Sequence, residues 1–305
     1  MFERLKTELS AVEAPIASAH SIPPLCYTDD HTFMLEQKAI FHQSWIGLGR
    51  ADRWKSPGDF STEDIAGVPV IVVRDKAGNL KAHSNSCRHR GAKLLSGCGH
   101  TSTISCPFHR WTYDLSGALR GAPDMEVTPG FNKSEYGLVS FRIEERQGFA
   151  FLCLGENAPD IDTWMGDFAD IHVPWNLSEL TSTRRRELEV DCNWKGFIEV
   201  FNEYYHLPYV HPDSISDVYA PPDPPDEVTG NYASQFGTTE GTGGLMEATQ
   251  QYALPPMPTL EGRNTHGTRY TWIYPNMTFA ASTEAVWIYD AHPISADRTR
   301  VGMTI

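Results

Sequence analysis

The first half of the chain breaks into short apolar runs separated by Gly, Asp and Pro, a pattern typical of β-strands. From about residue 41 to residue 153, the runs at 68–74 and 148–153 are of this kind. Residues 75–79 follow the first run, and their Gly and Asn tolerate positive φ, so they predict a hairpin turn between two paired strands. This part of the chain is therefore expected to be all-β.

The second half of the chain mixes several patterns. Residues 189–206 contain few Gly or Pro residues and scattered apolar positions, which predicts one helix, with Pro208 and Pro212 expected to end it. Residues 213 to about 262 are rich in Pro, Gly, Thr and acidic residues and predict long loops of the kind that form lids or are poorly ordered. From Arg269 onward the alternation of apolar and polar residues predicts strands again.

Composition and charge narrow the class of protein. The chain has 305 residues, 40% of them hydrophobic and 21% charged, and it lacks the 18 consecutive apolar residues of a membrane span, so we expect a soluble globular protein of two domains or one large one. Its formal charge of −14 disfavours a nucleic-acid partner. The N-terminus has no secretory pattern, which predicts a cytoplasmic protein whose six cysteines are thiols or metal ligands.

Two short segments each combine a cysteine with a histidine. Cys87 and His89 are followed, after sixteen residues, by Cys106 and His109. Such a set is compatible with a structural zinc site or with a Rieske [2Fe–2S] centre, in which two Cys hold one iron and two His hold the other. Because each segment contributes one Cys and one His, the ligands can divide by type between two irons, and this favours the Rieske centre over zinc.

A second constellation lies about a hundred residues further on. Glu203 and His206 are three residues apart and share a helix face, but His206 and His211 lie about 140° apart around an ideal helix. The two histidines can meet at one metal only if the helix breaks between them, and Pro208 is placed to break it. Two His and a carboxylate form the facial triad of non-haem Fe(II) oxygenases, although such spacing alone also fits ordinary core or surface histidines.

Together the two constellations make the chain resemble the α subunits of Rieske non-haem iron oxygenases over essentially its whole length. Residues 87–92 and 106–113 resemble the two cluster-binding loops of that family, and residues 193–211 resemble its catalytic segment. The resemblance implies a [2Fe–2S] cluster with Cys87 and Cys106 on the buried iron, and with His89 and His109 on the outer iron. Neutral imidazoles in place of thiolates raise the potential of such a cluster to roughly −150 to +300 mV.

The resemblance also implies a mononuclear Fe(II) site with His206 and His211 as ligands. Glu203 then occupies the family's bridging position, where a carboxylate links an iron ligand to a Rieske histidine of the neighbouring subunit, here His109, in a homotrimer. The bridge is needed because the two metals within one subunit would be too far apart for direct electron transfer. Most members have Asp at this position, and Glu is similar to the branch that acts on carnitine and glycine betaine.

The third iron ligand of the family is an Asp on a late helix, roughly a hundred residues beyond the histidine pair. Asp290 and Asp297 come near this spacing, but both lie in or between strand-like segments. We therefore expect the ligand to lie past Ile305 and the chain to be incomplete at its C-terminus.

The resemblance implies an overall α+β architecture in three parts. Residues 1–40 are expected to be an N-terminal segment that packs on the catalytic domain. Residues 41–155 are expected to be an all-β Rieske domain, an antiparallel sandwich that is inserted in or followed by the catalytic domain. Residues 156–305 are expected to be an α+β catalytic domain for mononuclear iron, with a central antiparallel sheet of helix-grip type.

The function implied is that of an O2-dependent mono- or dioxygenase that receives electrons from NAD(P)H through a reductase or ferredoxin. With the Glu bridge we favour oxidative N-demethylation or C–N cleavage of a quaternary ammonium compound. The alternative is hydroxylation or cis-dihydroxylation of an aromatic ring or aromatic acid. A non-catalytic Rieske electron carrier is a further alternative, against which the length of the chain argues.

Two groups of residues bear on the substrate and on the electron donor. Aromatic residues near the expected pocket either box a methylammonium group or belong to the core: Tyr205, Tyr209, Phe236, Tyr252, Tyr270, Trp272, Tyr274, Phe279 and Trp287. Basic residues around the cluster motifs are either solvated surface charge or a docking patch for an acidic ferredoxin or reductase domain: Arg88, Arg90, Lys93, Arg110 and Arg120.

Overall fold

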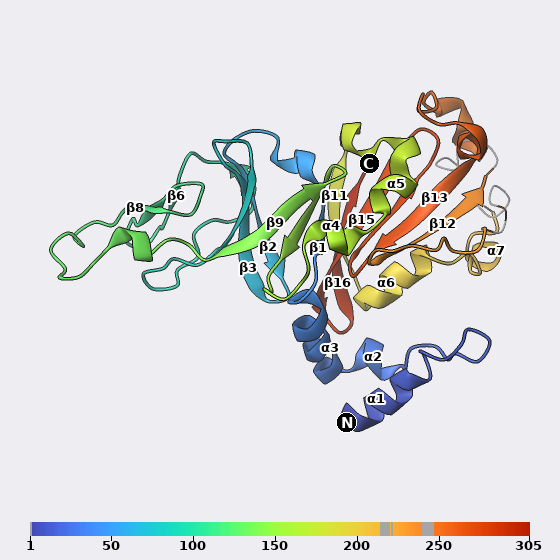
Figure 1. The fold of residues 1–305 in the computed structure, drawn as a ribbon, viewed down its shortest axis with the longest axis horizontal. Helices are drawn as coiled ribbons and strands as arrows, with labels where there is room; N and C mark the ends of the chain where they lie inside the picture. The colour runs from blue at the N-terminus through green and yellow to red at the C-terminus, as the bar shows by residue number, and fades with distance from the viewer. Residues whose placement is uncertain (1, 214–219, 221, 240–246) are drawn as a thin grey trace.

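The computed structural model describes residues 2–213, 220, 222–239 and 247–305. It is elongated, with a β domain at one end and a mixed domain at the other (Figure 1). Every strand pair among the described residues is antiparallel, and the α-helices of these residues accompany only the second domain and the N-terminal segment, so the predicted α+β architecture is confirmed. None of the helices in the described ranges combines the length and apolar character needed to cross a bilayer.

The β domain is built around the larger of its two sheets, which has seven strands within the described residues. In sheet order they are β1 (Ile46–Arg50), β10 (Phe149–Cys153), β9 (Ser140–Arg146), β4 (Leu80–Ser84), β3 (Val68–Arg74), β2 (Asp59–Ile65) and β5 (Cys98–His100). The smaller sheet consists of β6 (Ile104–Ser105), β7 (Thr112–Tyr113) and β8 (Leu119–Gly121). The predicted hairpin joins β3 to β4, and its Asp75 carboxylate accepts the N–H groups of Ala77 and Asn79.

The second domain has a central sheet of six strands in the described part of the chain. In sheet order they are β11 (Arg185–Val190), β16 (Arg298–Thr304), β15 (Val286–Ser295), β14 (Met277–Ala281), β13 (Gly267–Ile273) and β12 (Tyr232–Thr238). Helices α4 (Ile161–Met165) and α5 (Phe168–His172) pack on the face of this sheet that carries Ile288. Helix α6 (Trp194–Phe201) contacts the neighbouring Tyr289, which points to the opposite face because side chains alternate along a strand.

Shorter elements complete the chain. The N-terminal segment contains α1 (Phe2–Ser10), α2 (Leu25–Thr28) and α3 (Asp30–Glu36), followed by a π-helical turn (Gln37–Phe41), and α7 (Leu207–Val210) follows α6. Single 3₁₀ turns lie at Ala51–Trp54, Lys133–Glu135, Val173–Trp175, Leu177–Glu179, Glu247–Tyr252 and Gly262–His266. The two domains share core: Ile46 and Leu48 of β1 belong to the same buried cluster as Trp194 and Ile198 of α6.

The prediction of one helix over residues 189–206 is wrong at both ends. Glu189 and Val190 belong to strand β11, and the Asn193 side chain caps α6 by accepting the N–H of Lys195 at 3.1 Å. The helix ends at Phe201, because Asn202 turns back and its side-chain amide donates to the carbonyl of Ile198. These two asparagines satisfy backbone groups at the helix ends, and such groups would otherwise lose their partners.

Two further predictions need correction. Pro208 does not end a helix: it lies in the first turn of α7, where a missing N–H costs nothing. The long loops predicted for residues 213–262 are interrupted by strand β12. Residues 214–219, 221 and 240–246 of that span lie outside the described residues.

Candidate metal centres

The two Cys–His segments form two loops with the same backbone pattern. In each, the N–H of the Cys donates to the carbonyl five residues on, and the N–H four residues on donates back to the Cys carbonyl. The pairs are Cys87–Ala92 (2.9 Å) and Gly91–Cys87 (2.9 Å) in the first loop, and Cys106–Trp111 (2.8 Å) and Arg110–Cys106 (3.1 Å) in the second. In both loops the fourth residue after the Cys, Gly91 or Arg110, has positive φ. The two loops therefore share a backbone turn, although the histidine is the second residue after the cysteine in the first loop and the third in the second.

Burial separates the four predicted ligands by type. Cys87 is 4% exposed and Cys106 is 1% exposed, whereas His89 and His109 are exposed. The two imidazole rings are 4.8 Å apart, centroid to centroid. A [2Fe–2S] cluster held here would thus have thiolates on the core side and imidazoles on the solvent side, as the residue types require.

A residue that the sequence analysis did not single out lies beside the first cysteine. The Tyr113 hydroxyl accepts the N–H of Arg88 (3.1 Å) and lies 3.3 Å from Cys87 Sγ. Burial, and then the bond to Cys87, raises the pKa of Tyr113, so the phenol keeps its proton. Because its oxygen already accepts from Arg88, this proton is available to the sulfur. The only sequence signal was the position of Tyr113 within the second cluster-like motif.

The second constellation is arranged around helix α7. His206 precedes its first residue and His211 follows its last, and their ring centroids are 5.5 Å apart. The Glu203 carboxylate contacts His206 Nδ1 and also accepts the backbone N–H of His206 at 3.1 Å. Because Nδ1 is engaged, His206 Nε2 is the nitrogen left to bind a metal, and a carboxylate behind a ligating imidazole is the usual support for such a ligand.

A cavity of about 420 Å³ adjoins this histidine pair. Besides Glu203, His206 and His211, its wall is mainly aromatic: Phe201, Tyr204, Tyr270, Trp287 and Tyr289. Within the described part of the chain, no Lys or Arg lines it. The cavity therefore offers ring faces and a carboxylate to a ligand.

Only two of the nine predicted pocket aromatics, Tyr270 and Trp287, line this cavity. Phe236 and Phe279 are buried in the core, while Tyr205, Tyr209 and Tyr252 are largely exposed. Phe201, Tyr204 and Tyr289 line it without having been predicted. Phe201 and Tyr204 come from the α6 region and Tyr289 from β15, and their proximity depends on the packing of α6 against the sheet.

The two aspartates with family-like spacing serve other purposes. Asp290 is fully buried, and its carboxylate oxygens lie 2.8 and 3.0 Å from the Arg185 guanidinium and 3.2 Å from His292 Nε2. Burial by itself would raise the pKa of Asp290, but Arg185 and His292 hold that pKa well below its usual range. Asp297 accepts the Ser295 hydroxyl in the turn between β15 and β16.

No three His, Cys, Asp or Glu side chains in the described ranges converge tightly enough to hold a single metal ion. His206 and His211 supply only two ligands to a mononuclear iron. A Rieske cluster needs only two protein ligands for each of its irons, which the cysteine–histidine loops provide. The residues present thus fit part of a mononuclear iron site and all of a Rieske cluster.

The two constellations lie at opposite ends of the molecule. Strands β6 and β8, which adjoin the cysteine–histidine loops, mark one end of the long axis, and α7 marks the other (Figure 1). Electron transfer between them within one chain would have to cross the whole length of the protein.

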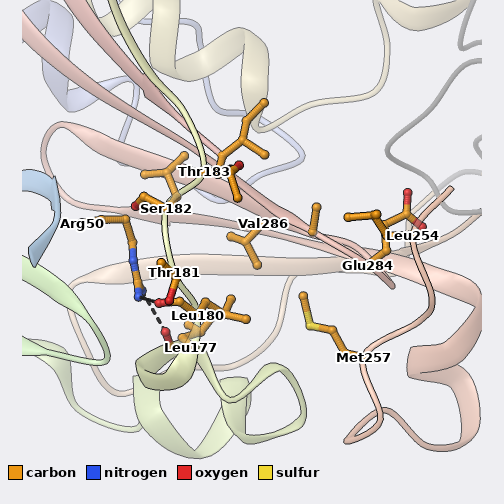
Figure 2. A pocket seen from close by; sticks show the side chains of 13 residues that line it. Arg50, Leu177, Leu180, Thr181, Ser182, Thr183, Leu254, Met257, Glu284 and Val286 are labelled. Carbon is orange, nitrogen blue, oxygen red and sulfur yellow. Dashed lines mark hydrogen bonds between the residues drawn. The ribbon is translucent and has the colours of Figure 1, made fainter. Parts of the chain in front are cut away.

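A separate cavity of about 130 Å³ contains none of the predicted site residues (Figure 2). Its walls are mostly aliphatic and include Leu254, Met257 and Val286. Arg50 lies at its edge and donates to the carbonyls of Leu177 and Leu180, which fixes the loop that precedes β11. We assign this cavity no part in either metal centre.

Two protein-family models match separate parts of the chain. A model described as "Rieske [2Fe-2S] domain" matches residues 44–132, and one described as "Ring hydroxylating alpha subunit (catalytic domain)" matches residues 177–305. The chain therefore contains a Rieske domain and a ring-hydroxylating catalytic domain, the two domains of the oxygenase family that its motifs resemble.

Curated relatives are oxygenase subunits of this family. The carnitine monooxygenase oxygenase subunit of Acinetobacter pittii is 32% identical over 203 residues, which are 66% of this chain and 55% of that protein. The glycine betaine monooxygenase oxygenase subunit of Pseudomonas aeruginosa is 32% identical over 216 residues, covering 70% and 49%. Benzene 1,2-dioxygenase subunit alpha of Pseudomonas putida is 32% identical over 196 residues, covering 62% and 43%. The chain spans about half the length of these relatives.

Solved structures show the same architecture. A quaternary ammonium Rieske monooxygenase in complex with L-carnitine superimposes with a TM-score of 0.75 at 27% identity, over 93% of this chain and 74% of that one. Naphthalene 1,2-dioxygenase from Rhodococcus gives a TM-score of 0.81 over 100% and 77%, and at 21% identity it shows the fold alone.

Proposed function

We propose that this chain acts as the oxygenase subunit of an O2-dependent Rieske monooxygenase that oxidises a quaternary ammonium compound by N-demethylation or C–N cleavage. The observation that carries the proposal is the pairing of a Cys2His2 surface site with a carboxylate-supported histidine pair beside an aromatic cavity. When bound, the two iron groups supply the electron and the activation of O2. The protein residues hold, orient and shield them.

In this proposal Cys87, Cys106, His89 and His109 hold the [2Fe–2S] cluster, and His206 and His211 hold Fe(II). Glu203 has two tasks. One is to fix the tautomer and orientation of His206 through Nδ1, which the contact between them supports. The other is to accept a hydrogen bond from His109 of the partner subunit in a homotrimer. The Glu203 side chain is 42% exposed, which is compatible with such a contact.

The composition of the cavity supports the substrate class. A methylammonium group carries its charge on methyl groups that cannot donate hydrogen bonds, and each aromatic face contributes about 0.5–2 kcal/mol to holding it. A bound cation also meets no Lys or Arg among the lining residues that the structure describes. The carnitine and glycine betaine monooxygenase relatives support the same class.

Aromatic ring hydroxylation or cis-dihydroxylation is the second candidate. It is favoured by the aromatic cavity wall, which would also bind a neutral ring, and by the similarity to a benzene dioxygenase subunit. Oxygen consumption by the iron-loaded protein, supplied with electrons by NAD(P)H and a reductase, is measured with carnitine or glycine betaine and compared with that on benzoate, which separates the two. Consumption that depends only on benzoate would contradict the quaternary ammonium proposal.

The sharpest test of the proposed bridge is Glu203→Gln. The amide keeps the size of the side chain but removes the charge that holds His206, so the variant should retain cluster and iron while turnover falls roughly 10- to 100-fold. Glu156→Gln changes an exposed glutamate in the same way and should keep full turnover. Normal turnover by Glu203→Gln would contradict the bridge. A wild-type protein that takes up no mononuclear iron would instead favour a non-catalytic electron carrier.

We further propose that electrons come from NAD(P)H through a reductase or ferredoxin that docks on the basic residues around the cluster loops. All five of them, Arg88, Arg90, Lys93, Arg110 and Arg120, are exposed. Complementary charge steers such encounters, so the rate of cluster reduction by the donor should fall as ionic strength rises. A rate that does not change with salt would remove the docking patch. The six unpaired cysteines favour a reducing compartment, the cytoplasm.

A further inference from the structure

The N-terminal segment binds the first turn of helix α6 through an ion pair and a hydrogen bond. Lys195 is buried, and its ammonium donates to both carboxylate oxygens of Glu36, at 2.7 and 2.9 Å. The indole N–H of Trp194 donates to the same carboxylate at 3.1 Å. Glu36 ends α3, which lies beside α6 (Figure 1). A charge-assisted pair with so little exposure is a strong and specific contact.

A second contact from the same segment reaches the last turn of α6. The Tyr27 hydroxyl donates to the Glu199 carboxylate at 2.7 Å, and the Lys195 ammonium lies over the Tyr27 ring at 5.3 Å. Burial, and then the bond to Glu199, raises the pKa of Tyr27, so the phenol stays a donor. The backbone carbonyl of Tyr27 also accepts from the Asn193 side chain, which caps the helix. Tyr27 thus contacts residues at both ends of α6.

Helix α6 leads directly to the candidate iron site. It ends two residues before Glu203 and five before His206, and an eight-residue helix has little stability of its own. Contacts at both of its ends therefore fix the position of the helix end from which the chain continues to Glu203 and His206. In a continuous helix, Glu199 would share a face with Glu203. Tyr27 instead holds the Glu199 carboxylate, which does not line the cavity, and Glu203 is the carboxylate that contacts His206.

We propose that Tyr27 and Glu36 are positioning residues of the mononuclear iron site, acting through Glu199 and Lys195 on helix α6. The inference rests on the proposed function, because it assumes that His206 and His211 bind iron. The N-terminal segment then belongs to the catalytic machinery although it touches neither metal nor substrate. The two contacts separate this role from general packing, since each can be removed without creating a cavity.

The test is Tyr27→Phe, which removes the hydroxyl and keeps the ring over Lys195. Fe(II) affinity, measured by titration of apoprotein whose Rieske cluster is intact, should fall about tenfold, the lower end of the loss that follows removal of a residue supporting a metal ligand. Cluster content and its reduction by dithionite should not change. Tyr252→Phe makes the same chemical change at a largely exposed tyrosine and should bind iron as the wild type does.

A double-mutant cycle adds a readout that a merely structural role would not move. Glu199→Ala should weaken iron binding as Tyr27→Phe does, and the double variant should be no worse than either single variant. Glu199→Gln keeps an oxygen that can accept from Tyr27 and should restore most of the affinity.

Each other outcome counts against a stated claim. Wild-type iron affinity in Tyr27→Phe, additive losses in the cycle, or simultaneous loss of the cluster would overturn the positioning role. If the wild-type protein itself binds no Fe(II), the proposed function fails instead, and the two failures are thereby distinguished.

Discussion

The hydroxyl of Tyr113 offers a direct way to probe the cluster through a single atom. Replacing Tyr113 by Phe removes the donor that lies 3.3 Å from Cys87 Sγ and leaves the ring, which is fully buried, in place. The N–H of Arg88 loses its acceptor at the same time. The change is therefore confined to the hydrogen bonds around one sulfur ligand.

The size of the effect follows from the charge on the sulfur. A hydrogen bond to a charged group contributes about 1.5–3 kcal/mol, and the bond is stronger to the reduced cluster, which carries one more negative charge. If half of the upper value, about 1.5 kcal/mol, distinguishes the two redox states, the one-electron potential falls by about 65 mV when the donor is lost. The sign is fixed: losing a donor destabilises the reduced state and lowers the potential.

A redox titration measures this shift. The titration is followed by the visible absorption of the cluster and by the electron paramagnetic resonance signal of its reduced form. Tyr136→Phe is the matched control, since Tyr136 packs in the same aromatic cluster against Trp111 and has no bond to a cluster ligand in the described structure. Its potential should stay within about 10 mV of the wild type on the same scale. An unchanged or raised potential in Tyr113→Phe would refute the assignment of the hydroxyl as a donor to the sulfur.

Two further predictions concern stability. Arg110 has φ of +59°, a left-handed conformation that costs a side chain about 1–2 kcal/mol, so Arg110→Gly should slow cluster loss in denaturant by the equivalent of about 1 kcal/mol. Arg90→Gly, at an ordinary φ, should bring no gain, and equal behaviour of the two would contradict the strain. Burial lowers the pKa of His172 to about 4 from its ordinary 6.5. The unfolded chain therefore takes up a proton first, and the free energy of unfolding should fall by up to about 3 kcal/mol as the pH drops from 6.5 to 4. Denaturation of His172→Gln across that range should show a flatter pH dependence, and an equally steep one would exclude His172 as the cause.

The sequence predicted structural features that depend on short motifs better than features that depend on contacts between distant parts of the chain. The hairpin at residues 75–79 and the burial of Cys87 and Cys106 follow from short motifs, and the structure shows both. Strand β11 was missed because it is an edge strand whose side chains are mostly exposed and charged, and its only apolar residues are Leu188 and Val190.

The site details that were missed are non-local. Tyr289 reaches the cavity from β15, nearly ninety residues after Phe201, and Tyr27 meets Glu199 across 172 positions. No periodicity within a window of ordinary length reports such pairs, because they depend on how α6 packs between the N-terminal segment and the sheet. The end of helix α6 at Phe201 was missed for a different reason. Pro208 predicted a later end, but the Asn202 side chain bonds to the carbonyl of Ile198 and ends the helix first.

The central claim is that one chain holds two different iron centres, and metal analysis of anaerobically purified protein combined with Mössbauer spectroscopy tests it most directly. The account predicts about three iron atoms and two acid-labile sulfides per chain, with one pair of inequivalent irons in a thiolate and an imidazole environment and one separate high-spin Fe(II). Zinc in place of iron at the cysteine–histidine loops, or a preparation without sulfide, would contradict it.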